Sequence, residues 1–413
     1  MIDPDEVVEA RRALGRRLAK YRLAAGLNQH QLAPHTHYSR STIANVEVGR
    51  QNVPRGFWER ADGLLAAHGV LLQGYDQLQA LVARQRWATA QLGAGQAAAG
   101  GPGLWMPTAR QRRLVTAVDV EAVRELTRAF CGLDNKLGGG HAYAAASRYF
   151  DSTVTTMLRD GTYVEGVGRE LHAAAAQLAH LVAWSAYDIQ EHEQAQRYFA
   201  KATDLATSAD DRAFCGEILA ARSHHAIHLG HPVEALALAR AAQENASKAA
   251  VPALLAESHE LEANGHALLG DSKASLASLH KAEVAFWRSN SLNQPDWLHY
   301  FDDRYLAARF AHCFRDLKQW NHARNFALQA VEMSENLARA RVFNTAVLAT
   351  THVETDLDEA CALGIRAARL ARTFQSARVL HYIRDIPHRL HARHGDHPQV
   401  RQFTEQLSEL GAY

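Results

Sequence analysis

The segment IHLGHPVEA, residues 227–235, decides the fold because related segments recur along the second half of the chain. The others are AYDIQEHEQA (186–195), ALLGDSKAS (267–275) and RDLKQWNHA (315–323). When they are aligned on Gln190, Gly230, Gly270 and Lys318, the spacings are 40, 40 and 48 residues. A recurring spacing of this size indicates an array of structural repeats.

Small side chains hold fixed places around these four positions. We expect each of the four aligned residues to lie in a turn between two helices. Small residues stand seven positions before the turn residue (Ala183, Ser223, Ala263, Ala311), five after it (Ala195, Ala235, Ser275, Ala323) and twelve after it (Ala202, Ala242, Ala282, Ala330). Small residues let antiparallel helices approach closely, so the pattern predicts stacked helical hairpins. On these residues the chain resembles the tetratricopeptide repeats over about residues 170–375, with periods longer than that family's usual 34. The resemblance implies an α-solenoid.

Weaker units flank this array. A fifth turn is expected near Thr355, with Ala360 and Ala367 in step. Two helices over 115–131 and 142–158, joined by the loop LDNKLGGGHA (133–142), are expected to open the array, and helices over 377–391 and 398–410 to cap it. The run Gly138 to Gly140 follows no strand and lacks a lysine at P-loop spacing, which argues against a nucleotide site.

Composition supports an all-α protein. Alanine, leucine and arginine are frequent, β-branched residues are scattered, and 47% apolar residues are enough for a packed core. No stretch is apolar for the roughly 20 residues that span a bilayer, and acidic residues stand where a signal peptide needs basic ones. A soluble cytoplasmic protein is expected.

Charge is unevenly divided. Residues 11–60 hold ten Arg or Lys against Glu47 and Glu59, a net +8, so the rest of the chain carries −7 to reach the total of +1. A basic N-terminal region suits phosphate binding, although such runs are also common on solvated helix faces.

Three short helical patterns share this basic region. A helix over 9–25 ends at Gly26, a second begins after Asn28 with Gln31 completing a capping box, and a third begins after Ser39 and ends at Gly49. Further helices are expected over 57–67 and 70–87, which makes a five-helix domain. Because the first turn of the third helix is polar, it is expected to face base edges and not a core.

On LNQHQLA, SRSTIANVE and the Gly49-Arg50 exit, residues 10–75 resemble the phage-repressor-like, or xenobiotic-response-element, helix-turn-helix family. The resemblance implies that Arg40, Ser41 and Asn45 face the bases, with Thr42 at the edge of the groove. It also implies phosphate contacts from Gln29, Arg50 and Arg55. Leu32, Ala33, Ile43 and Val46 are expected in the core, with Glu47 paired to a basic residue of the first helix. Pro34 inside the second helix and His37 in the turn depart from the family pattern.

The expected domains are residues 1–88, a linker over 89–113 and the repeat domain over 114–413. The stretch QLGAGQAAAGGPGLWMP (91–107) is rich in glycine and alanine and contains no charged residue. This composition is typical of a flexible linker. Trp105 in this stretch is either an anchor that docks on a folded domain, which we favour, or a side chain exposed by chance.

A binding groove is expected along the first helix of each repeat, whose exposed positions carry aromatic, imidazole and carboxylate side chains. These are Gln177, His180, Trp184, Tyr187, Asp188, Glu217, His224, His228, Glu257, Glu260, Asn264, Tyr305, His312, Arg315 and Asp316. Such a surface suits a peptide or small-molecule effector. The alternative is an ordinary solvated face.

Neither catalysis nor metal binding is expected. His224 and His228 stand four residues apart, and His388, His391, His394 and His397 recur every third residue, but no HExxH or nearby cysteine completes a zinc site. No GxSxG, SxxK or Cys/His signature is present, and no CxxC pair occurs. No cofactor is therefore expected.

A DNA-reading domain followed by helical repeats resembles bacterial transcriptional regulators that sense a peptide or small effector, of actinobacterial type. The resemblance implies double-stranded DNA as a partner and a homodimer formed mainly by the repeat domain. The rival hypothesis is an interaction adaptor, in which the repeat groove docks a protein partner and the N-terminal domain only anchors the adaptor to DNA.

Overall fold

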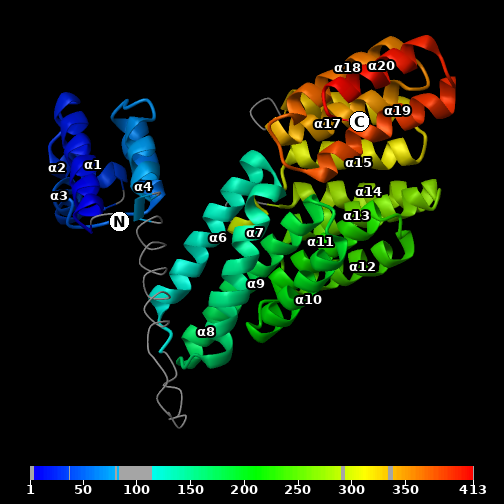
Figure 1. The fold of residues 1–413 in the computed structure, drawn as a ribbon. Coiled ribbons are helices and arrows are strands. Elements are labelled where there is room, and N and C mark those ends of the chain that lie inside the picture. The colour runs from blue at the N-terminus through cyan, green and yellow to red at the C-terminus, as the bar shows by residue number, and fades with distance from the viewer. Residues whose placement is uncertain are drawn as a thin grey trace, which may run out of the picture. The chain divides into compact units, whose positions relative to one another are not determined.

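Helices build both parts of the chain that the computed structural model describes, residues 4–36, 38–79, 81–82, 114–289, 294–333 and 338–412. The chain divides into two compact units, Met1–Ala109 and Arg110–Tyr413 (Figure 1). We call residues 4–82 the head and residues 114–412 the repeat domain. Within the described ranges the strand-like pairing is an isolated parallel bridge between Leu114 and Thr162, so the all-α prediction is confirmed. The expected linker and its Trp105 lie outside these ranges.

The head contains five helical segments. They are α1 (Pro4–Ala24), α2 (Gln29–Thr36), α3 (Arg40–Glu47), α4 (Arg55–Leu64) and helical residues at 70–79 and 81–82. Leu18, Leu32, Ile43, Phe57 and Leu71 are fully buried where these segments meet. One small core therefore fixes the positions of α2 and α3.

The predicted caps between the first three helices of the head are confirmed, although α1 starts at Pro4 and not at residue 9, and the helix expected over 57–67 is Arg55–Leu64. Gly26 has a left-handed φ of 70° after α1. Asn28 and Gln31 bond reciprocally, with Gln31 N donating to Asn28 Oδ1 at 2.9 Å and Asn28 N donating to Gln31 Oε1 at 2.8 Å. Ser39 Oγ accepts from Thr42 N at the start of α3. Pro34 lies inside α2, which ends two residues later, and His37 is outside the described residues.

In the described part of the repeat domain, five antiparallel helix pairs form the main array. They are α9 (Glu165–Asp188) with α10 (His192–Ser208), α11 (Arg212–His228) with α12 (Pro232–Lys248), α13 (Pro252–Leu268) with α14 (Ser272–Trp287), α15 (Asp303–Asp316) with α16 (Trp320–Met333), and α17 (Ala338–His352) with α18 (Leu357–Ala371). We call α9, α11, α13, α15 and α17 the first helices. Successive first helices contact one another, as α11 does α13 and α13 does α15.

The turn residues chosen from the sequence have the conformation that such turns need. Gln190, Gly230, Gly270 and Lys318 have φ values of 64°, 72°, 76° and 58°. All twelve small residues of the three columns are buried, and Ala360 and Ala367 of the fifth unit are also fully buried. The predicted helical repeat fold is confirmed.

The opening of the array differs from the prediction. Helix α6 (Ala117–Leu137) includes the first half of the expected loop, and α7 (Gly139–Tyr149) begins after a single intervening residue, Gly138. A π-helical turn (Phe150–Val154) and α8 (Thr155–Asp160) follow. Gly138 has φ of 94°, and a Cβ there would lie 2.6 Å from the carbonyl oxygen of Gln375. The glycines therefore allow a close backbone approach in place of a ten-residue loop.

The two ends of the array meet. The expected cap is present as α19 (Ala377–His394) and α20 (Pro398–Glu409). Helix α19 contacts α9, and α17 contacts α6. Gln375 N donates to Leu137 O at 2.7 Å, and Gly140 N donates to Gln375 O at 3.0 Å. The array is thus closed on itself by backbone hydrogen bonds between its first and last parts.

In the described part of the chain, no helix is long and apolar enough to cross a membrane.

Candidate functional site

Helix α3 has a buried face and a polar face. Ile43, Val46 and Glu47 are buried, whereas Arg40 and Ser41 are exposed and Asn45 is half-buried. At about 100° per residue, Ser41 and Asn45 lie opposite the buried side, whereas Arg40, the first residue of the helix, lies at the edge of the buried side, close in angle to Glu47. Thr42 is half-buried at the edge of the polar side. The head therefore brings the four residues expected to read bases onto one short helix.

The hydroxyls at the start of α3 are occupied by the helix cap. Ser39 Oγ lies 2.8 Å from Ser41 Oγ and 3.0 Å from Thr42 Oγ1. Among the residues that the structure describes, the side chains of Arg40 and Asn45 have no hydrogen bond or ion pair. These two side chains are free to take new partners.

A buried ion pair ties the three N-terminal helices together. Arg22 of α1 donates through Nε to Glu47 Oε1 at 2.6 Å and through Nη2 to Glu47 Oε2 at 3.0 Å. Gln29, the first residue of α2, donates through Nε2 to Glu47 Oε2 at 2.8 Å. The expected pairing of Glu47 with the first helix is confirmed. The pair fixes the start of α2 against the end of α3.

An open hollow of about 400 Å³ lies beside this ion pair. It is lined by Arg22, Asn28, Gln29, His30 and Arg40. Within the described residues, the backbone N–H groups of Gln29 and His30, at the first turn of α2, have no acceptor. Free N–H groups at a helix N-terminus with an arginine beside them form a site suited to a phosphate.

The other two expected phosphate contacts differ in their surroundings. Arg50 is exposed and has no side-chain partner among the described residues. Arg55 is exposed but forms ion pairs with Glu59 and, at 3.4 Å, with Asp76. Arg50 is thus available to an incoming anion, while Arg55 would have to leave two carboxylates.

The residues expected to line an effector groove lie on the first helices, but they are not exposed. Tyr187, Asp188, Glu217, Glu257, Glu260, Asn264 and His312 are buried, and Gln177, His180, Trp184, His224, His228, Tyr305, Arg315 and Asp316 are half-buried. The expectation of exposed positions is wrong. Two segments outside the repeat pattern, residues 296–301 and α19, contribute side chains that pack against these residues.

Tyr300 joins two of the buried carboxyl groups. Its hydroxyl lies 3.0 Å from Glu217 Oε1 and 2.9 Å from both oxygens of Glu257. Nearby, Trp297 packs edge-on against Phe214, with ring centroids 5.3 Å apart. Burial raises the pKa of Glu217 to about 7 and that of Glu257 well above its usual value. At neutral pH these carboxyl groups are at least partly protonated.

Arg309 centres a second part of this interior. It donates through Nε to Glu260 Oε1 at 2.8 Å and through Nη2 to Asn264 Oδ1 at 3.1 Å. Its Nη1 lies 3.1 Å from His224 Nε2, and His224 Nδ1 lies 3.3 Å from the Tyr187 hydroxyl. Because arginine can only donate, His224 Nε2 accepts and Nδ1 carries the proton. Burial also lowers the pKa of His224, so the ring is neutral.

Arg378 of α19 closes the interior from the far end of the array. Its guanidinium lies over the rings of Tyr187 and Phe343, at 4.9 and 4.7 Å from their centroids, and its Nε lies 3.3 Å from Asp188 Oδ1. Sequence reasoning missed Arg309, Arg378 and Tyr300. Arg309 is on a first helix in a column that was not considered, but Arg378 and Tyr300 lie outside the repeats.

Within the described ranges, no group of three or more His, Cys, Asp or Glu side chains could hold a metal ion. His228 packs against His381, with ring centroids 4.9 Å apart, and burial lowers its pKa to about 3.

Comparison with known families gives a match in the head. A family model described as a helix-turn-helix domain matches residues 13–73, which span α1 to the helix after α4. No curated protein shows significant similarity to the chain. Residues 13–73 therefore form a helix-turn-helix domain, and this domain supports a DNA-binding regulator.

Proposed function

We propose that the protein is a sequence-specific transcriptional regulator that acts by binding and not by catalysis. Its head reads DNA, and its repeat domain dimerises and senses a peptide or small-molecule effector. The observation that carries the DNA-reading part is the pair of unpartnered side chains on α3, Arg40 at its first position and Asn45 on its polar face. A capped, well-packed helix that leaves such groups free suits readout of base edges.

In this proposal α3 enters the major groove. Arg40 pairs with a guanine and Asn45 with an adenine, each worth roughly 1–3 kcal/mol of discrimination. Ser41 and Thr42 contact base edges or the groove wall. Gln29, Arg50 and Arg55 hold phosphates and set the register. The hollow at the start of α2 is the phosphate site that fixes the angle of approach.

The effector part rests on unsatisfied acceptors inside the repeat domain. Glu217 Oε2 and Glu260 Oε2 are buried and have no hydrogen-bond partner among the described residues. Buried acceptors without partners are costly. A ligand with N–H or ammonium donors, such as a short peptide, would satisfy them after displacing Tyr300. Such a ligand shifts the domain only by its greater affinity for one state of the array.

We propose a dimer because α3, the helix that would read the bases, is short. Helix α3 has eight residues, which cover only a few base pairs, and paired half-sites multiply specificity. The test combines light scattering after size exclusion with binding to DNA that carries one or two half-sites. A dimer whose isolated repeat domain also dimerises supports the proposal. A monomer, or a dimer held only by the heads, contradicts it.

The packed interior favours one alternative. Because the expected groove residues bond to one another, the repeat domain could serve as a rigid adaptor for a protein partner, with the head as its anchor on DNA. The two functions differ in sequence dependence. An adaptor's head would bind all DNA sequences alike, whereas a regulator binds its operator far more tightly than random DNA.

A further inference from the structure

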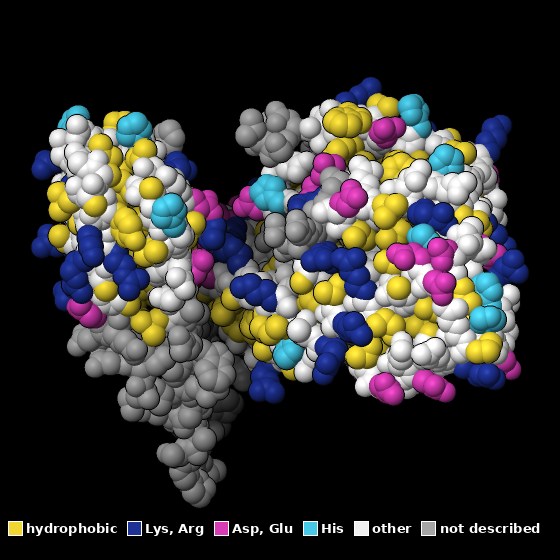
Figure 2. All heavy atoms as spheres, turned by 90° about the horizontal axis from the view of Figure 1, so that it is seen from above, with side chains coloured by type: hydrophobic (Ala, Val, Ile, Leu, Met, Phe, Trp, Pro, Cys, Tyr) yellow, Lys and Arg dark blue, Asp and Glu magenta, His cyan; other side chains and the backbone are white. Residues whose placement is uncertain are grey.

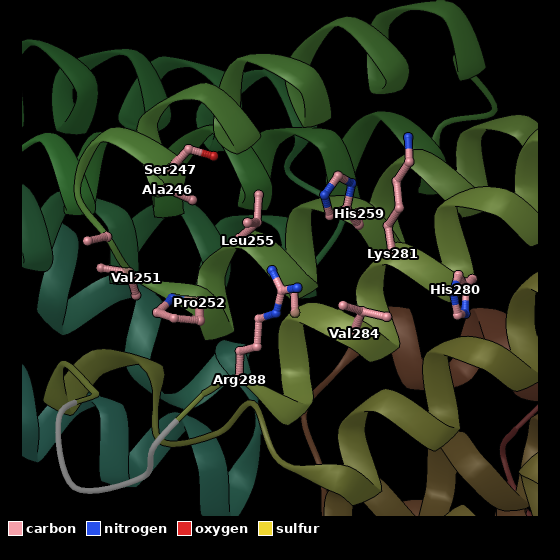
Figure 3. A pocket seen from close by; sticks show the side chains of 12 residues that line it. Ala246, Ser247, Val251, Pro252, Leu255, His259, His280, Lys281, Val284 and Arg288 are labelled. Atoms are coloured by element: carbon pink, nitrogen blue, oxygen red, sulfur yellow. The ribbon is translucent and has the colours of Figure 1, made fainter.

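A groove of about 560 Å³ lies between the end of α12, the start of α13 and the last turns of α14 (Figure 3). Its apolar surface comes from Ala246, Val251, Pro252, Leu255, Val284 and Ala285. None of these residues belongs to the interior network of the first helices described above. The α12 and α14 residues among them include the small side chains Ala246 and Ala285, and Leu255 of α13 is half-buried.

The polar part of the groove is basic. Among the described residues, its lining includes His259, His280, Lys281 and Arg288 and contains no carboxylate. Arg288 and Lys281 are exposed and have no ion pair among the described residues. Figure 3 shows the Arg288 side chain extending between Pro252 and Val284 toward Leu255, with His259 and Lys281 at the other end of the groove. The positive charge thus lies directly beside apolar surface.

The preceding repeat, 40 residues earlier, shows what this groove lacks. There Glu244 and Lys248 form an ion pair on α12, and Val284 and Arg288 occupy the equivalent places on α14. Asp211 caps α11 by accepting from Phe214 N at 2.9 Å, whereas Val251 at the start of α13 offers no side-chain acceptor. In the preceding repeat, Glu244 therefore neutralises Lys248, and Asp211 caps the start of α11. The next repeat replaces both carboxylates with valine.

We propose that this groove binds a small apolar carboxylic acid. The carboxylate pairs with Arg288 near the uncapped start of α13, where the helix dipole also favours a negative charge. The hydrocarbon part lies on Leu255, Val284 and Ala285. The volume is that of a small-molecule site. All lining residues fall within 246–288, so the groove does not continue along the array as a peptide site would.

The test titrates the full-length protein with octanoate by calorimetry, beside octanol and octylamine, which keep the chain and change the charge. Octanoate is expected to bind, and the two controls to bind at least about tenfold more weakly. Val284→Glu restores on α14 the i, i+4 pair seen in the preceding repeat, and Arg288→Glu reverses the charge. Both variants are expected to weaken octanoate by about tenfold or more.

The matched control is Lys248→Glu, at the place equivalent to Arg288 in the preceding repeat. It should leave octanoate binding unchanged. All three positions are exposed, so the circular dichroism of the variants should match the parent. Equal binding of octanoate and octanol, or binding that Val284→Glu and Arg288→Glu leave intact, would overturn the proposal. So would tight binding of an acidic helical peptide with no binding of octanoate. The outcome does not depend on whether the head binds DNA.

Discussion

Arg22 and Glu47 form a buried ion pair, with Nε of Arg22 2.6 Å from Oε1 of Glu47 and side chains only 8% and 7% exposed. The two residues are far apart in sequence, on α1 and α3, and Gln29 at the start of α2 shares the same carboxylate. This charged contact therefore adds to the apolar core in holding α3 against the start of α2.

Removing one partner of this pair should destabilise the head. Glu47→Ala leaves the Arg22 guanidinium buried without a counter-charge, which costs about 3–5 kcal/mol. Hydrogen exchange with mass spectrometry should then show faster exchange in peptides of α1 to α3 and unchanged exchange in the repeat domain. The double variant Arg22→Met, Glu47→Leu should exchange nearly as slowly as the parent, because no charge stays buried. Equal exchange in Glu47→Ala and the parent would show that the pair is not needed.

The two phosphate arginines should contribute unequally to DNA binding. Arg50→Ala should reduce the slope of log affinity against log salt concentration by about 1. Arg55→Ala should reduce it less, because Arg55 must first leave Glu59 and Asp76. Fluorescence anisotropy over a salt series measures both slopes. A larger loss for Arg55→Ala would reverse the assignment.

The closure of the repeat domain should depend on Asp188. This buried carboxylate accepts from Gly139 N and from Ser376 Oγ, each at 2.9 Å, and pairs with Arg339 and Arg378. Asp188→Ala leaves two guanidinium groups without their shared partner and should cost about 3–5 kcal/mol. Small-angle scattering should show a larger radius of gyration for the isolated repeat domain. Ser376→Ala, which removes one neutral donor, should cost only about 1 kcal/mol. An unchanged radius in Asp188→Ala would mean that packing alone closes the array.

The stability of the repeat domain should fall as pH rises, because the buried Glu217 carboxyl group then loses its proton. Burial holds its native pKa at about 7, whereas the unfolded chain releases this proton near 4.5. Between these values the native state binds more protons, so raising the pH favours unfolding, by roughly 3 kcal/mol in total. Glu217→Gln keeps the acceptor for Tyr300 and removes the titration.

Urea unfolding at about pH 5 and about pH 8 measures this effect. The free energy of unfolding of Glu217→Gln, relative to the parent, should rise between the two pH values. Histidines such as His225, whose pKa burial lowers to about 4, change stability in the opposite direction on acidification, but they do so equally in both proteins. A constant difference between variant and parent would contradict the raised pKa.

Much of the fold could be predicted because its signals are local or periodic. Gln190 and Lys318 were identified as turn residues only by their place in the repeat, and both have the left-handed φ of a turn. The caps at Asn28 and Ser39 depend on residues three positions away. The polar face of α3 follows from the helical period alone. Each of these features is set by neighbours in sequence.

The interior of the repeat domain could not be predicted in the same way. Tyr300 reaches Glu217 across 83 residues, and Ser376 reaches Asp188 across 188. Neither contact leaves a periodic signal, because residues 296–301 and α19 are not repeats. The repeat pattern alone therefore predicts an exposed groove along the first helices, and the glycines at 138–140 alone predict a loop. A long-range close approach explains both errors.

The measurement that tests the central claim most directly is fluorescence anisotropy of the purified protein on the DNA upstream of its own coding region, over a salt series. The parent is compared with the Arg40→Ala, Asn45→Ala double variant. In the parent these two side chains have no partner within the described residues. The account predicts tight, sequence-selective binding that weakens steeply with salt and that the variant loses by at least about tenfold on the specific site. Binding by both proteins with equal affinity for operator and random DNA would contradict it.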